Sequence, residues 1–141
     1  MNVYAGFRAF IDYACSEPAT IRVAASTLDR LYVNGEFIGH GPARGPHGYY
    51  RVDEWKTLPW RSNGKNVVAI EVAGYNANSY YVLDQPSFLQ AEVTVGETVL
   101  AATGVEANPF IGFPIAERMQ KVQRYSFQRP FVEVWQLAPG Y

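Results

Sequence analysis

The sequence predicts an all-β domain built as a β-sandwich or a barrel. Aromatic residues make up 15% of the 141-residue chain, and flat side chains suit the pleated, half-buried surface of a strand. Short β-rich runs bounded by Gly, Pro, Asn and Ser recur at intervals of roughly 8 to 12 residues, which is typical of these two architectures. Residues 115–125 come nearest to a helical pattern, but their stripe of Ile115, Met119 and Val122 is thin and predicts one helical turn at most.

The strands follow from runs in which apolar and polar residues alternate. In the first run Phe7, Ala9, Ile11 and Tyr13 share one face, as a half-buried strand requires. The predicted strands span residues 7–14, 20–26, 29–39 as a hairpin, 49–55, 66–74, 87–95, 98–103, 124–129 and 131–137.

The 29–39 run is the clearest hairpin. Asn34-Gly35 readily takes the positive φ angles of a type I′ turn, whose twist matches the flanking strands. We expect Leu31 and Val33 to pair across it with Phe37 or Ile38.

Three longer irregular segments are expected, at 40–48, 75–86 and 104–114. Binding residues gather on such loops when a rigid sheet supports them, so a site is expected there.

Charge and cysteine content narrow the function classes. Twelve basic and thirteen acidic residues leave a net charge of −1 with both signs interspersed, which gives no footprint for nucleic acid or an anionic membrane. The single cysteine, Cys15, excludes an internal disulfide, and a buried structural thiol is its plainest interpretation. No apolar stretch approaches the roughly eighteen residues of a membrane span. We therefore expect neither nucleic acid nor a membrane as a partner.

The segment FIGHGPARGPHGYY, residues 37–50, holds four glycines, two prolines and both histidines of the chain. It does not match a dinucleotide fingerprint, because Arg44 stands where the third glycine belongs, and it lacks the Gly-Lys-Ser/Thr end of a P-loop. Its glycines and prolines suit a stiff crossing between two strands.

Metal and catalytic arrangements are also disfavoured. His40 and His47 could join Asp53 or Glu54 at a metal, but the histidines are seven residues apart with two prolines between them. No Gly-x-Ser-x-Gly elbow is present, and adjacent carboxylates on a strand point to opposite faces rather than across a cleft. We expect no cofactor, no metal and no catalytic residue in this chain.

Sugar binding requires a flat aromatic against a pyranose face and a few polar groups that fix the hydroxyls. Suitable residues occur in the predicted loops, although core packing of the aromatics and ordinary surface roles for the polar side chains are the simpler alternatives. The candidates for contact with carbohydrate or with another domain are Arg44, His47, Trp60, Asn76, Asn78, Tyr80 and Tyr81.

Several motifs occur in a familiar order. YVNG is followed by IGHGPAR, Tyr50 and Asp53, then by GKNVVAIEV and, near the end, RYSFQRPFVEVW. From about Tyr4 to Trp135 this succession resembles the N-terminal β-sandwich domain of bacterial α-L-rhamnosidases of glycoside hydrolase family 78. The resemblance implies a galactose-binding-like jelly roll that serves as an accessory domain of a multidomain enzyme.

In that family the catalytic carboxylates lie on a separate (α/α)₆ barrel, so the resemblance carries no catalytic residue onto this chain. It implies that residues 1–141 are one sandwich domain excised from a larger enzyme, with other domains of that enzyme as partners, and that the parent is periplasmic or secreted. The expected role is packing against the catalytic domain, with carbohydrate as a further contact. An autonomous carbohydrate-binding module and a small self-contained hydrolase are the alternatives. A packing role predicts an apolar surface patch larger than a monomer usually shows.

Overall fold

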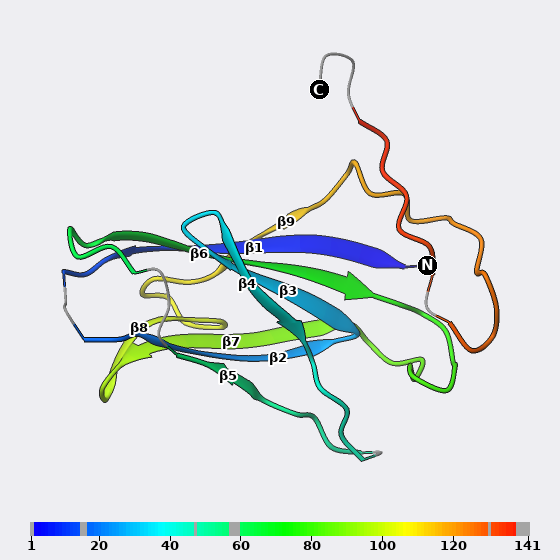
Figure 1. Ribbon diagram of the computed structural model, residues 1–141, viewed down its shortest axis with the longest axis horizontal. Coiled ribbons are helices and arrows are strands. Elements are labelled where there is room, and N and C mark those ends of the chain that lie inside the picture. The colour runs from blue at the N-terminus through cyan, green and yellow to red at the C-terminus, as the bar shows by residue number, and fades with distance from the viewer. Residues whose placement is uncertain (1, 15–16, 47, 57–59, 130, 138–141) are drawn as a thin grey trace.

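A computed structural model of the chain describes residues 2–14, 17–46, 48–56, 60–129 and 131–137. Two antiparallel β-sheets face each other and form a sandwich, as the sequence predicts (Figure 1). The first sheet has the strand order β4 (Glu36–Gly41), β3 (Leu28–Val33), β6 (Lys65–Gly74), β1 (Val3–Asp12) and β9 (Ile111–Pro114). The second has the order β5 (Asp53–Trp55), β2 (Thr20–Ser26), β7 (Phe88–Val95) and β8 (Thr98–Ala102).

The hydrophobic core lies between the two sheets because apolar residues alternate along the strands and meet on the inner faces. Phe7, Ala9 and Ile11 of β1 pack there as predicted, whereas Tyr13 follows the strand and is exposed. Burial of each large apolar side chain stabilises the fold by roughly 1.5–3 kcal/mol. The most deeply buried members of this core are Ile21, Val23, Leu31, Val33, Val68, Ile70 and Val93.

The hairpin between β3 and β4 forms at the predicted turn, with φ angles of 54° at Asn34 and 87° at Gly35. Its register differs from the prediction, because Val33 pairs with Glu36, while Leu31 pairs with Gly39. A two-residue turn makes the residues on either side of it partners, and a bulge between Leu31 and Tyr32 then shifts the pairing by one residue.

The C-terminal part of the chain departs from the predicted strands. Residues 124–129 and 131–137 form no strand, and their backbone pairing is limited to the isolated bridges Arg124–Phe131 and Arg118–Trp135 among the described residues. Instead, Glu133 binds Arg30 on the outer face of the first sheet, while Arg124 and Phe127 contact Asn78 and Tyr80 in the loop between β6 and β7.

Further boundaries were wrong, including that of β1, which begins at Val3 rather than at residue 7. The strand expected at 49–55 is only β5, and β9 lies within the segment 104–114 that was expected to be irregular. Gly112 and Pro114 weaken the alternation in β9, and its pairing partner β1 is about a hundred residues away, so no local signal marks it.

No helix occurs among the described residues, including 115–125, and accordingly none is long and apolar enough to cross a membrane.

Candidate functional site

A groove of about 1040 Å³ lies at one end of the sandwich. Its walls come from the end of β2, from the β4–β5 loop, from the β6–β7 loop and from the C-terminal segment, and the two loops project beyond the same end of the sheets (Figure 1). The groove is defined here by its polar and aromatic lining, which comprises Ser26, Thr27, Arg44, Tyr49, Tyr50, Arg51, Ser79, Tyr80, Tyr81, Gln85, Gln128 and Arg129.

Four tyrosines line the groove and are between 57% and 76% exposed. One of them is held firmly: the Tyr50 ring meets Phe88 of β7 edge to face at 4.7 Å, and its hydroxyl donates to Gln85 Oε1 at 3.0 Å. Gln85 Nε2 in turn donates to Ser26 Oγ of β2 at 2.9 Å. This chain of contacts ties both loops of the groove to the second sheet.

The β6–β7 loop presents the other aromatic pair on a compact turn. The Ser79 hydroxyl accepts hydrogen bonds from the backbone N–H groups of Tyr81 and Val82, each at 3.0 Å, and the Ser79 N–H donates to Val82 O at 2.8 Å. Val82 is buried in a second apolar cluster with Tyr4 and Tyr75. The turn therefore has an apolar anchor beneath it while Tyr81 faces the groove.

Arginine gives the groove its charge. The Arg44 guanidinium lies 3.9 Å from the centre of the Tyr81 ring, in cation–π geometry. Arg51 lies 3.7 Å from Asp53, whereas Arg44 and Arg129 make no ion pair with a carboxylate in the described part of the chain. No Asp or Glu occurs among the described lining residues, so the lining is cationic although the chain is nearly neutral.

Three of the seven predicted contact residues, Arg44, Tyr80 and Tyr81, meet in this groove. His47 lies outside the described residues. Asn78 acts as a loop support, because its side-chain oxygen accepts from the Asp84 N–H at 2.8 Å.

The two other predicted residues lie away from the groove lining. The Asn76 N–H donates to the Asn2 side chain at 3.3 Å, and Trp60 packs against the main core with its indole nitrogen buried. Trp60 thus follows the simpler alternative for an aromatic residue, a place in the core.

Sequence reasoning missed Tyr49, Tyr50 and Gln85, which line the groove as well. The Tyr49-Tyr50 pair was assigned to a strand because aromatic residues favour strands, and nothing local shows that the strand begins only at Asp53. The preceding Gly-Pro-rich stretch was the available signal that the tyrosines belong to a loop.

Beneath the β4–β5 loop, two carboxylates converge on Gly41. A Cβ on this glycine would overlap Asp53 Oδ2 and lie 3.0 Å from Asp29 Oδ1. Asp29 is buried, and neither of its oxygens has a hydrogen-bond partner among the described residues. Burial, with a smaller contribution from the Asp53 charge, raises the pKa of Asp29 to about 6.

A metal ion at the Asp29–Asp53 pair would need a further His, Cys, Asp or Glu ligand. The described residues contain no group of three or more His, Cys, Asp or Glu side chains that could hold a metal ion. Asp53 Oδ2 accepts the Ala43 N–H at 3.2 Å, which fixes the start of the crossing loop. Glu54 faces away and pairs with Arg22 and Lys56, each at 2.8 Å, and the hydrogen bond from Lys56 contributes most to the lowered pKa of Glu54.

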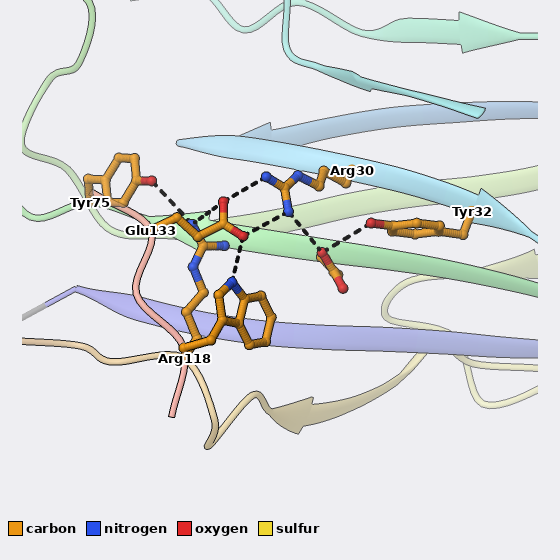
Figure 2. Close-up of polar contacts among 7 residues, drawn as sticks. Arg30, Tyr32, Tyr75, Arg118 and Glu133 are labelled. Atoms are coloured by element: carbon orange, nitrogen blue, oxygen red, sulfur yellow. Dashed lines mark hydrogen bonds and ion pairs between the residues drawn. The ribbon is translucent and has the colours of Figure 1, made fainter. Parts of the chain in front are cut away.

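A second feature lies on the outer face of the first sheet, where Glu133 holds the C-terminal segment (Figure 2). Its carboxylate accepts two hydrogen bonds from Arg30 of β3, at 2.7 and 3.1 Å, and one from Trp135 Nε1 at 2.8 Å. Arg118 Nη2 is 3.5 Å from the same carboxylate, and its guanidinium lies 4.1 Å from the centre of the Tyr4 ring. The hydrogen bond from Arg30 is the main cause of the lowered pKa of Glu133.

A hollow of about 550 Å³ lies beside this network. Its lining mixes apolar residues such as Phe113 of β9, Trp135 and Leu137 with the charged residues Arg8, Glu71 and Glu117. Phe10, Phe37 and Ile111 on the same sheet are each more than half exposed.

The fold and the groove together define an all-β sandwich domain that carries a ligand-sized, cationic and aromatic groove at one end.

Comparison with known proteins identifies where such a domain occurs. The chain is similar to the GH78 family rhamnosidase of Bacillus sp. GL1, with a TM-score of 0.86 and 26% sequence identity. The similarity covers 99% of this chain and 16% of that chain, so the present chain corresponds to one domain-sized part of the rhamnosidase. No family model and no curated protein matches the chain. The resemblance stated from the sequence motifs is thereby confirmed.

Proposed function

We propose that this chain is a non-catalytic accessory domain of a rhamnosidase-like glycoside hydrolase, which packs against the catalytic domain and contacts carbohydrate through the groove. The observation that carries the proposal is the similarity over 99% of the chain to a 16% portion of a GH78 family rhamnosidase. A part of that size matches an added domain better than a complete hydrolase.

The chemistry of the groove supports a non-catalytic role. Glycoside hydrolysis ordinarily uses two carboxylates on opposite sides of the scissile bond, roughly 5 to 9.5 Å apart. Every Asp and Glu of the chain lies in the described segments, and none of them lines the groove. The converging pair of Asp29 and Asp53 is unsuitable, because the Asp29 carboxylate is shielded from solvent.

The outer face of the first sheet supports the packing role. Exposed apolar side chains often mark interaction surfaces, and this face presents Phe10, Phe37 and Ile111 on separate strands together with the hollow at Phe113. Glu133 and its arginine partners fix the path of the C-terminal segment across the same face. A fixed path would hold this domain at a defined angle to a following domain.

An autonomous carbohydrate-binding module is the second candidate. It is favoured by the groove itself, whose volume of about 1040 Å³ and exposed tyrosines match what a saccharide requires.

Three measurements separate these functions. The complete reading frame of the gene should encode a long helical catalytic region if the accessory role is right. Isothermal titration of the 141-residue chain with L-rhamnose, galactose and plant oligosaccharides should give saturable heats if the chain has affinity of its own. Turnover of an aryl rhamnoside by the chain alone would contradict both proposals and would favour the alternative of a small self-contained hydrolase.

A further inference from the structure

The charge of the groove bears on the class of saccharide that it accepts. A neutral sugar is normally held by aromatic faces and by paired donors and acceptors, with carboxylates among the acceptors for its hydroxyls. Here the charged lining side chains are Arg44, Arg51 and Arg129, and the described lining contains no carboxylate. Of these three cations, Arg51 has a carboxylate nearby, Asp53 at 3.7 Å, whereas Arg44 and Arg129 make no ion pair in the described part of the chain.

Arg44 is the best-placed of these donors. Its guanidinium carbon lies 3.9 Å from the centre of the Tyr81 ring, so the aromatic face helps to hold the cation in the groove. It makes no ion pair within the described chain. The fork of N–H groups on arginine matches a carboxylate, and such charge-assisted pairs are stronger than neutral hydrogen bonds.

The other two arginines extend the positive charge along the groove. Arg129, in the C-terminal segment, also lines the groove, and its guanidinium is 5.7 Å from the centre of the Tyr125 ring. Arg51 is only loosely paired with Asp53, at 3.7 Å, and its side chain is 58% exposed. These cations come from two separate segments of the chain, so the charge is a property of the assembled groove.

We propose that the groove selects an anionic saccharide, one whose pyranose rings carry carboxylates as in a uronate oligosaccharide, with Arg44 as the principal carboxylate contact and Tyr81 and Tyr50 as aromatic surfaces for the rings. This inference rests on the carbohydrate contact of the proposed function and specifies the class of saccharide that makes the contact.

The test uses a pair of ligands that differ only in charge. Isothermal titration of the 141-residue chain with α-1,4-linked trigalacturonate is compared with its fully methyl-esterified form, which keeps the same rings and linkages. The free acid should bind at least tenfold more tightly, and raising NaCl from 50 to 500 mM should weaken its binding while leaving that of the ester unchanged.

Variants assign the contact. Arg44→Gln should weaken trigalacturonate binding about tenfold, since one charge-assisted hydrogen bond is lost. Arg61→Gln, which changes an exposed arginine outside the groove lining, should bind like the wild type. Unfolding curves of the two variants show whether each remains folded, and the comparison of the two ligands on the wild-type chain needs no variant.

The outcomes distinguish this inference from the function on which it rests. Equal binding of acid and ester would overturn the anionic class and leave the carbohydrate contact standing. Equal binding of trigalacturonate and a sulfated carrageenan trisaccharide would overturn the carboxylate assignment. If neither trigalacturonate nor the neutral sugars bind, the proposed carbohydrate contact is refuted. The accessory role would then still depend on the reading frame.

Discussion

The buried carboxyl of Asp29 leads to a quantitative prediction about stability and pH. The change is Asp29→Asn, which keeps the shape of the side chain and removes its ionisation. In the unfolded chain this carboxyl has its ordinary pKa of 3.8, and in the folded chain burial raises the pKa to about 6. Because the folded state holds the proton more tightly, Asp29 stabilises the fold fully below pH 3.8, and this contribution is lost as the pH rises to about 6.

The magnitude follows from the size of the shift. One pKa unit corresponds to about 1.4 kcal/mol, so the complete change amounts to about 3 kcal/mol in the free energy of unfolding. About 2 kcal/mol of it falls between pH 4.5 and 7.5, which is a convenient range for measurement. Over that range the stability of Asp29→Asn relative to the wild type should rise by this amount as the pH increases.

Urea unfolding followed by tryptophan fluorescence at several pH values measures this difference. Glu97→Gln, at an exposed turn between β7 and β8, is the control. Its free energy of unfolding should change with pH in the same way as that of the wild type. Parallel curves for Asp29→Asn and the wild type would refute the argument, because they would mean that Asp29 has the same pKa in both states.

Three further substitutions test other parts of the structure. Glu133→Gln should lower the free energy of unfolding by about 1–2 kcal/mol, less at high salt, since it removes the ion pair with Arg30 on a partly exposed surface; a salt-independent loss would contradict this. Ile70→Ala should cost about 2–5 kcal/mol because the side chain is fully buried, and a loss below 1 kcal/mol in the same urea assay would show that this part of the core is loosely packed. Gly39→Ala should lower the melting temperature by several degrees, because a Cβ there would overlap the Trp55 ring, whereas Gly104→Ala would meet no neighbouring atom and is strained only by its positive φ.

The strands of the two sheets were predictable where burial on one face imposes alternation. β2, β6 and β7 lie almost where the sequence placed them, because each keeps one apolar face toward the core along its length. The C-terminal segment shows the limit of that signal. Glu133 alternates with Val132 and Val134 as in a strand, yet its side chain binds Arg30 on the outer face of the first sheet, and the described backbone around it forms only isolated bridges.

The groove was predictable only in part. Arg44, Tyr80 and Tyr81 were chosen because their residue types suit sugar binding and they lie in expected loops, and the structure brings these three together. Trp60 and Asn78 were chosen by the same reasoning, but in the structure they support the fold. A residue type does not reveal which way its side chain points.

The sequence by itself determined the all-β class, most of the strands and the Asn34-Gly35 turn, since these depend on alternation and backbone preferences over a few neighbouring residues. Only the tertiary structure decided that Arg44 stacks on Tyr81, that Arg129 faces the same groove and that Asp29 is buried beside Asp53. These contacts join segments that are distant in the chain, so they depend on the order and register of the strands that carry them. Sheet order and register arise from packing the whole core at once, and no local stretch of residues encodes them.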